Sequence, residues 1–532
     1  MRPRLQIVAA CLLAALGLSA CGDGETGAPA AKPYKDPELY AGTTLKRGGL
    51  ELPARIQGQE LALAYRGKFA GRFWPGVNLG VTVPGRHPGE LAPTRRDYDR
   101  WLDGMQDLGA RVVRVYTILR PAFYEALAAL NKRNPRTPLY FIQGVWIPEE
   151  ELLASHDTDA INAEFDREIA DAVAAVHGDA TLPERPGHAS GRYRTDVARW
   201  LLAWSPGVEW DPYATRNNDR RQPGAPAYQG RYIASTEGAT RTESWLAARL
   251  DHLATLEAQR GWSRPLTFTN WLTTDPLEHP EEPMDKEDMV SVDAMHLRAH
   301  HKGQAVMITE FGVPTGIGSA HLGPLGRDQG DHPEQETGRM DADMLGAIER
   351  QKMAGGLLFS YTDEWFKRTW NTMDMEKPED RRPLWQNALT NEEQFGLVAA
   401  EAGKQAAVTA DGSDHEWTRT QSQQIYEGGG TVREVRATHD ANWLYLLVRR
   451  SGEKAVQLGF DVRPGGNQGL PGRPGVSPDA TSRSRSARSA RPCCTRRPGP
   501  IRSASCTGWR APTCRSRRPT WSPAAAPGCA RS

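Results

Sequence analysis

Residues 305–312 read AVMITEFG, an apolar run that ends in a threonine and a glutamate before Phe311 and Gly312. A short apolar run of this length is typical of a buried strand. Charged side chains are rarely buried unless they are paired or functional. The segment therefore predicts a strand over Ala305 to Thr309, and Glu310 at its end is the first candidate for a reactive group.

A second carboxylate of this kind occurs upstream, where residues 200–210 read WLLAWSPGVEW. The run from Trp200 to Trp204 predicts another buried strand, and Glu209 follows it. Cleavage of a glycosidic bond uses two carboxyl groups that flank the bond. The pair of glutamates therefore predicts a site for glycan cleavage.

Between residues 72 and 399, short apolar runs alternate with longer helical patterns, which is typical of βαβ units around a parallel sheet. We expect an α/β fold with eight strands, the number that closes a (β/α)8 TIM barrel. An open doubly wound sheet is the competing fold, but no Gly-rich phosphate loop follows the first strand. The expected strands are residues 76–83, 111–116, 139–146, 200–204, 266–270, 289–294, 305–309 and 356–361, and the expected helices are residues 95–108, 121–132, 159–177, 242–260 and 334–353.

The spacing of the two glutamates agrees with this strand count. Glu209 follows the fourth expected strand and Glu310 the seventh, and they are 101 residues apart. Three βα units of a barrel of about 250 residues take roughly 94 residues. Both carboxylates are therefore expected on the face of the barrel where strands end and loops begin.

These motifs resemble the clan A retaining glycoside hydrolases. The run Ile308 to Gly312 is similar to the strand that ends in the nucleophile, and Gly207 to Glu209 is similar to the strand that ends in the acid/base. The resemblance implies that Glu310 is the nucleophile and Glu209 the acid/base. The chain departs from the clan at Val208, where asparagine is usual, which affects the usual contact to the sugar 2-hydroxyl. The run from Val112 to Tyr116 is similar to the second strand, which implies that Arg114 lies beside the nucleophile and favours its ionised form.

Further residues are expected at the sugar-binding site. Aromatic side chains offer flat apolar faces to sugar rings, although a core role is the default for each ring. We select Trp271, Tyr361 and Trp365, and we expect His296 either near Glu310 or as a structural histidine. Residues 360–367 read SYTDEWFK and resemble the last strand of β-glucan-acting transglycosylases. The resemblance implies that Asp363 and Glu364 bind substrate, and the alternative is that one of them replaces Glu209.

The amino-terminal residues are typical of a secretion signal. A basic start, a short apolar stretch and small residues precede Cys21, so residues 1–20 resemble a bacterial lipoprotein signal peptide. The resemblance implies acylation of Cys21 and attachment to a membrane of the cell envelope. Residues 21–35, rich in Gly, Ala, Pro and Thr, are expected to form a flexible tether. An ordinary secretory peptide with a chance cysteine is the alternative. Residues 36–71 are expected as an extension packed on the barrel, with a small strand pair.

The carboxyl-terminal part changes character twice. Residues 400–474 contain short strand patterns with turns, which predict a small β-sandwich of the carbohydrate-binding kind. A shift of the reading frame after these residues would truncate this sandwich. Residues 475–532 hold twelve arginines, one acid and no apolar periodicity, so we interpret them as a disordered or out-of-frame tail. An Arg-rich tail that binds nucleic acid or anionic lipid is the other interpretation. Without the tail, 54 basic and 64 acidic residues give a net charge of −10.

The residue types exclude several other chemistries. All seven cysteines lie in the signal segment or the tail, so the body contains neither disulfides nor cysteine-ligated zinc. No His-Glu-x-x-His pattern and no Gly-x-Ser-x-Gly elbow occurs, and we predict no metal and no cofactor. The expected partners are a polysaccharide or oligosaccharide substrate and a membrane, with no nucleic acid.

Two functions remain from different classes. The first is a surface-anchored retaining glycoside hydrolase or transglycosylase that acts on a polysaccharide through two glutamates. The alternative is a non-catalytic glycan-binding surface lipoprotein, an interpretation that Val208 keeps open.

Overall fold

The computed structural model divides the chain into two compact units, residues 1–406 with 439–443, and residues 407–438 with 444–532. Each unit is described by itself. The described residues are 37–81, 83, 86, 88–207, 209–269, 302–315, 319–322, 328–330, 332–364, 394–399, 408, 414–418, 420–439, 444–452, 456–460 and 482–485.

The first unit is built on a six-stranded sheet in the order β11-β8-β7-β6-β15-β12. Every neighbouring pair in this sheet is parallel. The strands are β6 (Trp74–Leu79), β7 (Val112–Val115), β8 (Tyr140–Val145), β11 (Leu201–Pro206), β12 (Ile308–Phe311) and β15 (Gly355–Leu358).

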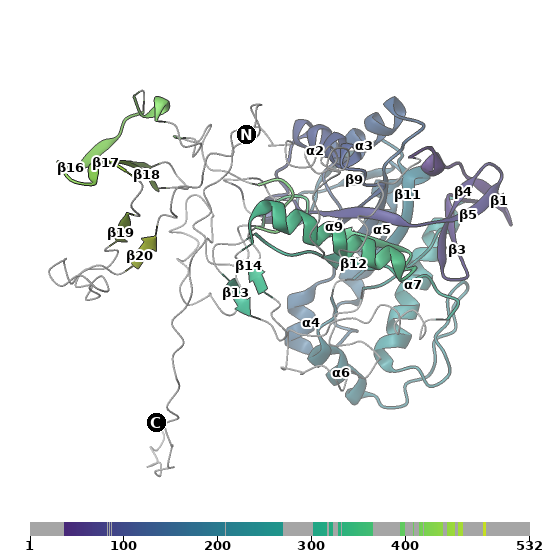
Figure 1. Cartoon of the computed structure of the whole chain (residues 1–532). Helices are drawn as coiled ribbons and strands as arrows, with labels where there is room; N and C mark the ends of the chain where they lie inside the picture. Colours follow the sequence, from purple (N-terminus) through teal and green to yellow (C-terminus); the bar gives the residue numbers. More distant parts are fainter. Residues whose placement is uncertain are drawn as a thin grey trace, which may run out of the picture. The chain divides into compact units, whose positions relative to one another are not determined.

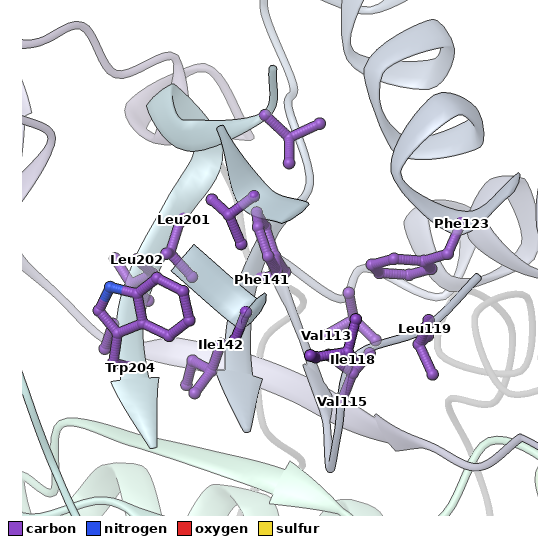
Figure 2. Packing of buried hydrophobic residues seen from close by; sticks show 14 of the residues in the cluster. Val113, Val115, Ile118, Leu119, Phe123, Phe141, Ile142, Leu201, Leu202 and Trp204 are labelled. Atoms are coloured by element: carbon purple, nitrogen blue, oxygen red, sulfur yellow. The ribbon is translucent and has the colours of Figure 1, made fainter. Parts of the chain in front are cut away.

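Three neighbouring strands of the sheet are buried along their whole length, as expected for a parallel sheet covered on both faces. All residues of β7, β8 and β11 are buried. Their apolar side chains pack with those of the following segments, and Figure 2 shows Phe123 of a neighbouring helix over Val113 and Ile118. The apolar residues whose pattern predicts these strands therefore form the hydrophobic core of the unit.

The sheet is curled rather than flat. Arg114, on the central strand β7, forms hydrogen bonds with Glu310 of β12 and with Thr269. Thr269 lies three residues after Leu266, which bridges to Trp204 of the other edge strand, β11. Strands in a sheet are about 4.8 Å apart, so either partner would lie beyond the reach of one arginine in a flat sheet. The six strands thus form a curled half-barrel.

Helices connect the strands and begin at residues with a clear local cause. Helix α2 (Arg95–Asp107) and helix α7 (Arg241–Gln259) each begin with a Thr/acid capping box, which satisfies their first backbone N–H groups. Helix α3 (Pro121–Arg133) begins with proline at its first position and lies beside α2 (Figure 1). The other α-helices among the described residues of the unit are α4 (Glu149–Ser155), α5 (Asn162–Val176), α6 (Pro212–Arg221) and α9 (Glu334–Arg350).

Short antiparallel elements complete the first unit. Strands β1 (Leu45–Arg47) and β2 (Leu50–Leu52) form one hairpin, and β3 (Ala54–Gln57), β4 (Glu60–Tyr65) and β5 (Lys68–Arg72) form a three-stranded sheet. The expected single strand pair in residues 36–71 is therefore too small, because three two-residue turns, at residues 48–49, 58–59 and 66–67, fold this segment into five strands. Two more pairs are β9 (Ala180–Leu182) with β10 (Gly191–Tyr193), and β13 (Ser319–Leu322) with β14 (Asp328–Gly330).

Six of the eight expected barrel strands form the sheet, so the prediction of an α/β fold with a parallel sheet is confirmed. The expected strand over residues 266–270 is present only as the bridge at Leu266. The expected strand over residues 289–294 lies outside the described residues. Complete closure into a (β/α)8 barrel therefore stays a prediction.

The second unit contains one three-stranded sheet in the order β16-β17-β18, formed by β16 (Gln423–Glu427), β17 (Val432–His439) and β18 (Leu444–Arg450). A separate antiparallel pair joins β19 (Gln457–Phe460) to β20 (Ser482–Arg485). Within the described part of this unit, the expected sandwich is thus present only as these two sheets. The tail pattern does not predict β20, which lies within residues 475–532.

The described helices include none that is both long and apolar enough to cross a lipid bilayer.

Candidate active site

Glu310 lies at the carboxyl end of the parallel sheet, where its strand is irregular. Strand β12 pairs with β15 at Ile308 and Phe311, and the register shifts between these two residues. Such an irregularity changes the direction of a side chain and interrupts the ladder. The Thr309 carbonyl instead accepts a hydrogen bond of 2.9 Å from Nδ2 of Asn78, a fully buried residue of β6.

Arg114 is the cation beside this carboxylate. Its Nη1 donates to Oε1 of Glu310 at 2.8 Å and also to Oδ1 of Asn78 at 3.2 Å, while Nη2 reaches Oγ1 of Thr269 at 3.4 Å. The Arg114 side chain is only 4% exposed, against 29% for Glu310. A buried guanidinium needs an anionic partner, so Arg114 and Glu310 form one electrostatic unit. The structure thus brings together the two residues that the resemblance pairs.

Tyr116 is the second donor to the same carboxylate oxygen. Its hydroxyl donates to Oε1 of Glu310 at 2.7 Å, and the Arg114 guanidinium lies 4.5 Å from the centre of its ring. Burial raises the pKa of Tyr116 well above its ordinary value, and the negative charge of Glu310 adds to the shift. Tyr116 therefore stays protonated and acts as a fixed donor.

This arrangement gives the two carboxylate oxygens of Glu310 different environments. Both donors contact Oε1, and Oε2 accepts no hydrogen bond from the described residues. Charge-assisted hydrogen bonds are among the stronger and more directional contacts in proteins. Glu310 is thus held as an oriented carboxylate through one of its two oxygens.

Glu364 lies near this cluster, beyond the end of β15. It is 5% exposed, and its negative charge contributes to the raised pKa of Tyr116. The backbone of Gly80, at the end of β6, approaches Glu364 closely, since a Cβ on Gly80 would lie 3.5 Å from Oε1 of Glu364. A second carboxyl group is therefore present at this end of the sheet.

Asp363 points to a different environment from its neighbour Glu364. Its Oδ1 accepts a hydrogen bond of 3.0 Å from the backbone N–H of Gly396, and the residue is 6% exposed. The Asp363 N–H donates to the carbonyl of Val398. These contacts tie the chain after β15 to residues 394–399, and they give Asp363 a structural role.

Glu209 lies on an exposed bend beyond the end of β11. The preceding Gly207 has φ +96°, and a Cβ there would lie 2.3 Å from the ring of the buried Trp210. The turn that carries Glu209 therefore requires glycine at position 207. Among the described residues, the hydrogen bonds of Glu310 go to Arg114 and Tyr116, and none joins it to Glu209.

Only some of the aromatic residues expected to bind sugar lie among the described residues. The expectation that Tyr361 binds sugar disagrees with its position, because its ring is 1% exposed and contacts Trp101 of α2 edge to face at 6.5 Å. Trp271, His296 and Trp365 lie outside the described residues, as does the acylation candidate Cys21. Their roles stay predictions.

Asn78, Tyr116 and Thr269 belong to the site but are not predicted from the sequence. The signal for Tyr116 is its place two residues after Arg114, since alternate residues of a strand lie on one face. Asn78 is also recognisable in the sequence, because it is a polar residue inside an apolar strand pattern. No local pattern indicates that Thr269 reaches Arg114, 155 residues away.

No group of three or more His, Cys, Asp or Glu side chains within the described ranges is arranged to hold a metal ion. The polar groups around Glu310 are instead an arginine, a tyrosine and an amide, which bind and orient an anion.

No model of a protein family and no curated protein sequence matches the chain. Among solved structures, the chain is similar to an endo-laminarinase from Formosa, with 11% identity, a TM-score of 0.39 and coverage of 62% of this chain and 83% of that one. It is also similar to β-glucuronidases from Parabacteroides merdae (10% identity, TM-score 0.37, coverage 76% and 43%) and Bifidobacterium dentium (12%, 0.36, 65% and 46%). The chain spans less than half of the length of these two β-glucuronidases. Likenesses at this level assign neither a family nor an activity, so the functional argument rests on the site itself.

Proposed function

We propose that the chain is a retaining glycoside hydrolase or transglycosylase that acts on a polysaccharide. The observation that carries the proposal is the double hydrogen bond from Arg114 and Tyr116 to one oxygen of Glu310. A nucleophilic carboxylate must be ionised and oriented before it attacks, and these two donors supply both conditions. The carboxyl end of a curled parallel sheet is also the usual place for such a group.

In this mechanism, Oε2 of Glu310 attacks the anomeric carbon while a carboxylic acid protonates the leaving oxygen. The bond to the leaving group breaks, and a glycosyl ester forms on Glu310. The same acid, now a carboxylate, then removes a proton from water or from a sugar hydroxyl, which attacks the anomeric carbon and releases Glu310. Arg114 and Tyr116 keep their hydrogen bonds to Oε1 throughout.

We propose Glu209 as the acid/base. It follows β11, the fourth expected barrel strand, and Gly207 gives the turn after this strand a shape that other residues do not readily adopt. The competing assignment is Glu364, which is buried near Tyr116. Asp363 is a weaker candidate because its Oδ1 accepts the Gly396 N–H.

The proposal is tested first on Glu310. The Glu310→Gln variant removes the nucleophile and nearly preserves shape, so we expect kcat on an aryl glycoside to fall by at least 10³-fold. Glu349→Gln, an exposed change on α9, is the matched control and should leave kcat unchanged. Retained anomeric configuration in the product, observed by NMR, is the second requirement. Unchanged turnover in Glu310→Gln, or an inverted product, would refute the mechanism.

The acid/base is identified by chemical rescue. In an alanine variant of the true acid/base, substrates with good leaving groups still glycosylate the enzyme, and azide then restores turnover by attacking the glycosyl-enzyme. We expect this rescue for Glu209→Ala and not for Glu364→Ala. Rescue of Glu364→Ala alone would move the assignment to Glu364.

A second function is a glycan-binding protein without catalysis. The exposure of Glu209, and Val208 before it where asparagine is usual, favour this alternative. Binding of a polysaccharide by calorimetry, combined with no turnover by the wild type on a broad glycan panel, would support it. The two functions are therefore separated by the same panel.

We further propose that acylated Cys21 anchors the protein to a bacterial membrane, with the body facing the periplasm or the exterior. Membrane fractionation tests this location. Wild-type protein should sediment with membranes and carry the mass of attached acyl chains, whereas Cys21→Ser should lose both. Equal fractionation of the two proteins would refute the anchor.

A further inference from the structure

Helix α9 presents a carboxyl group to the segment that follows β12. Asp341 is 8% exposed, and its Oδ1 accepts a hydrogen bond of 3.1 Å from the backbone N–H of Val313. Val313 is three residues beyond Glu310. A side chain of α9 thus contacts the backbone directly after the proposed nucleophile.

Within the described residues, few other hydrogen bonds fix the segment after Glu310. Strand β12 ends at Phe311. The Phe311 carbonyl accepts a hydrogen bond from the backbone N–H of Phe359, which directly follows the neighbouring strand β15. Gly312 follows with φ +153°, and a Cβ there would lie 2.6 Å from the Phe359 carbonyl. The next backbone contact is the hydrogen bond from Thr315 to Gln394. Between Phe311 and Thr315, the hydrogen bond to Asp341 is the only one that a backbone N–H forms within the described residues.

The other side of Glu310 is held in a similar way. The carbonyl of Thr309 accepts from the side chain of Asn78, because the ladder between β12 and β15 is irregular at this point. Glu310 is thus flanked by two hydrogen bonds between a side chain and the backbone, one on each side.

We propose that Asp341 is a positioning residue for Glu310, which through Val313 holds the backbone in the place where Arg114 and Tyr116 reach Oε1. This inference rests on the proposed function, because it assigns Asp341 to the reaction that Glu310 performs. Asp341 itself contacts no reacting atom.

The chemistry of this helix face agrees with a positioning role. Thr337 lies one turn before Asp341 on α9, and its buried hydroxyl finds no hydrogen-bond partner in the described part of the chain. A helix face that packs on a sheet ordinarily carries apolar residues, and here it carries a hydroxyl and a carboxyl group. Burial also raises the pKa of Asp341 to about 7, so the protein holds this group at an energetic disadvantage near neutral pH. Packing alone does not explain an acid at this position.

The test uses variants of Asp341 that distinguish the effect of its hydrogen-bond acceptor from the effect of its side-chain volume. Asp341→Asn keeps an oxygen that can accept the Val313 N–H, whereas Asp341→Leu keeps much of the volume without an acceptor, and Asp341→Ala removes both. Asp343→Ala, an exposed change on the same helix, is the control. Two readouts are used: amide hydrogen exchange of a peptide spanning residues 311–315, and the separate values of kcat and KM.

We expect faster exchange in Asp341→Leu and Asp341→Ala, with kcat at least tenfold lower and KM changed by less than about threefold, because a small displacement of a reacting group mainly affects the chemical step. Asp341→Asn and Asp343→Ala should match the wild type within about threefold in both constants.

Each deviation has a definite meaning. Unchanged exchange in Asp341→Leu would overturn the contact, and faster exchange with unchanged kcat would overturn the positioning role. A fall in kcat that Asp341→Asn shares fully would also overturn it, because the acceptor would then not be the relevant feature. A wild type without turnover on any glycan would refute the proposed function and, with it, the positioning role, while the exchange data would still report whether the contact exists.

Discussion

The buried carboxyl group of Asp341 makes the stability of the first unit depend on pH in a defined direction. Burial raises its pKa from an ordinary 3.8 to about 7, and the hydrogen bond from Val313 opposes this shift only in part. Between these two pH values the folded protein binds a proton that the unfolded chain has released. The free energy of unfolding therefore decreases as pH rises from about 4 to about 7, and the loss is complete above that range.

The magnitude follows from the size of the shift. Each pKa unit corresponds to about 1.4 kcal/mol, so the three-unit shift of Asp341 corresponds to a loss of about 4 kcal/mol at pH 8 and of about 1 kcal/mol near pH 4.5. Asparagine cannot ionise, and it can still accept the Val313 N–H. Asp341→Asn should therefore stabilise the protein, by up to about 4 kcal/mol at pH 8 and by much less at pH 4.5.

Thermal unfolding of both proteins at the two pH values measures this difference. A gain of 4 kcal/mol corresponds to an increase of Tm on the order of 5–10 °C in a unit of this size. Asp343→Asn on the exposed side of α9 is the control and should change Tm little at either pH. A Tm difference between Asp341→Asn and wild type that is the same at pH 4.5 and pH 8 would refute the reasoning, since only a titrating group makes the difference depend on pH.

Three further predictions concern other contacts of the first unit. Tyr116→Phe removes one hydrogen bond to a charged group, worth about 1.5–3 kcal/mol, so kcat should fall by roughly 10- to 100-fold with KM nearly constant, and an unchanged kcat would contradict the role of the hydroxyl. Arg264→Met removes the guanidinium that pairs with the buried Glu257 and leaves that carboxyl group only its contact with His177, so urea unfolding should show a loss of about 3–5 kcal/mol, whereas a stable variant would show that the pair is dispensable. Gly207→Ala introduces a Cβ 2.3 Å from the Trp210 ring at φ +96°, and the strain of about 1–3 kcal/mol should lower Tm and kcat together.

The parts of the fold that the sequence predicts well are those with a local cause. Helices α2 and α3 are observed within one residue of the expected bounds, because an N-terminal cap or proline and an apolar face define them. The expected strand over residues 305–309 is shifted, and β12 begins only at Ile308. Helices α4 and α6 are missed, since they are short and polar, with little apolar periodicity.

The site is predictable only where strand order determines it. Glu310 is found from the sequence because it follows an apolar strand pattern, and parallel strands bring their carboxyl ends to one edge. Arg114 is found only through the resemblance of residues 112–116 to the second strand of clan A. Asn78 and Asp341 are not found, because they act through backbone groups 231 and 28 residues away, and a bond to the backbone leaves no requirement on the partner's side chain. Such contacts appear only when the register of β12 against β15 is known.

The energetics of these residues favour a functional interpretation of the site. The ion pair between the buried Arg114 and the half-buried Glu310 contributes little net stability, because the loss of hydration, above all of the guanidinium, offsets most of the attraction. Asp341, on the neighbouring helix, lowers stability at neutral pH by the amount derived above. Two arrangements that do not favour folding thus converge on the same stretch of backbone, Thr309 to Val313. Apolar side chains of similar volume would serve packing at least as well. Fixed donors and charges are what a preorganised carboxylate needs when charge moves during a reaction, and this requirement explains why the unit contains them here.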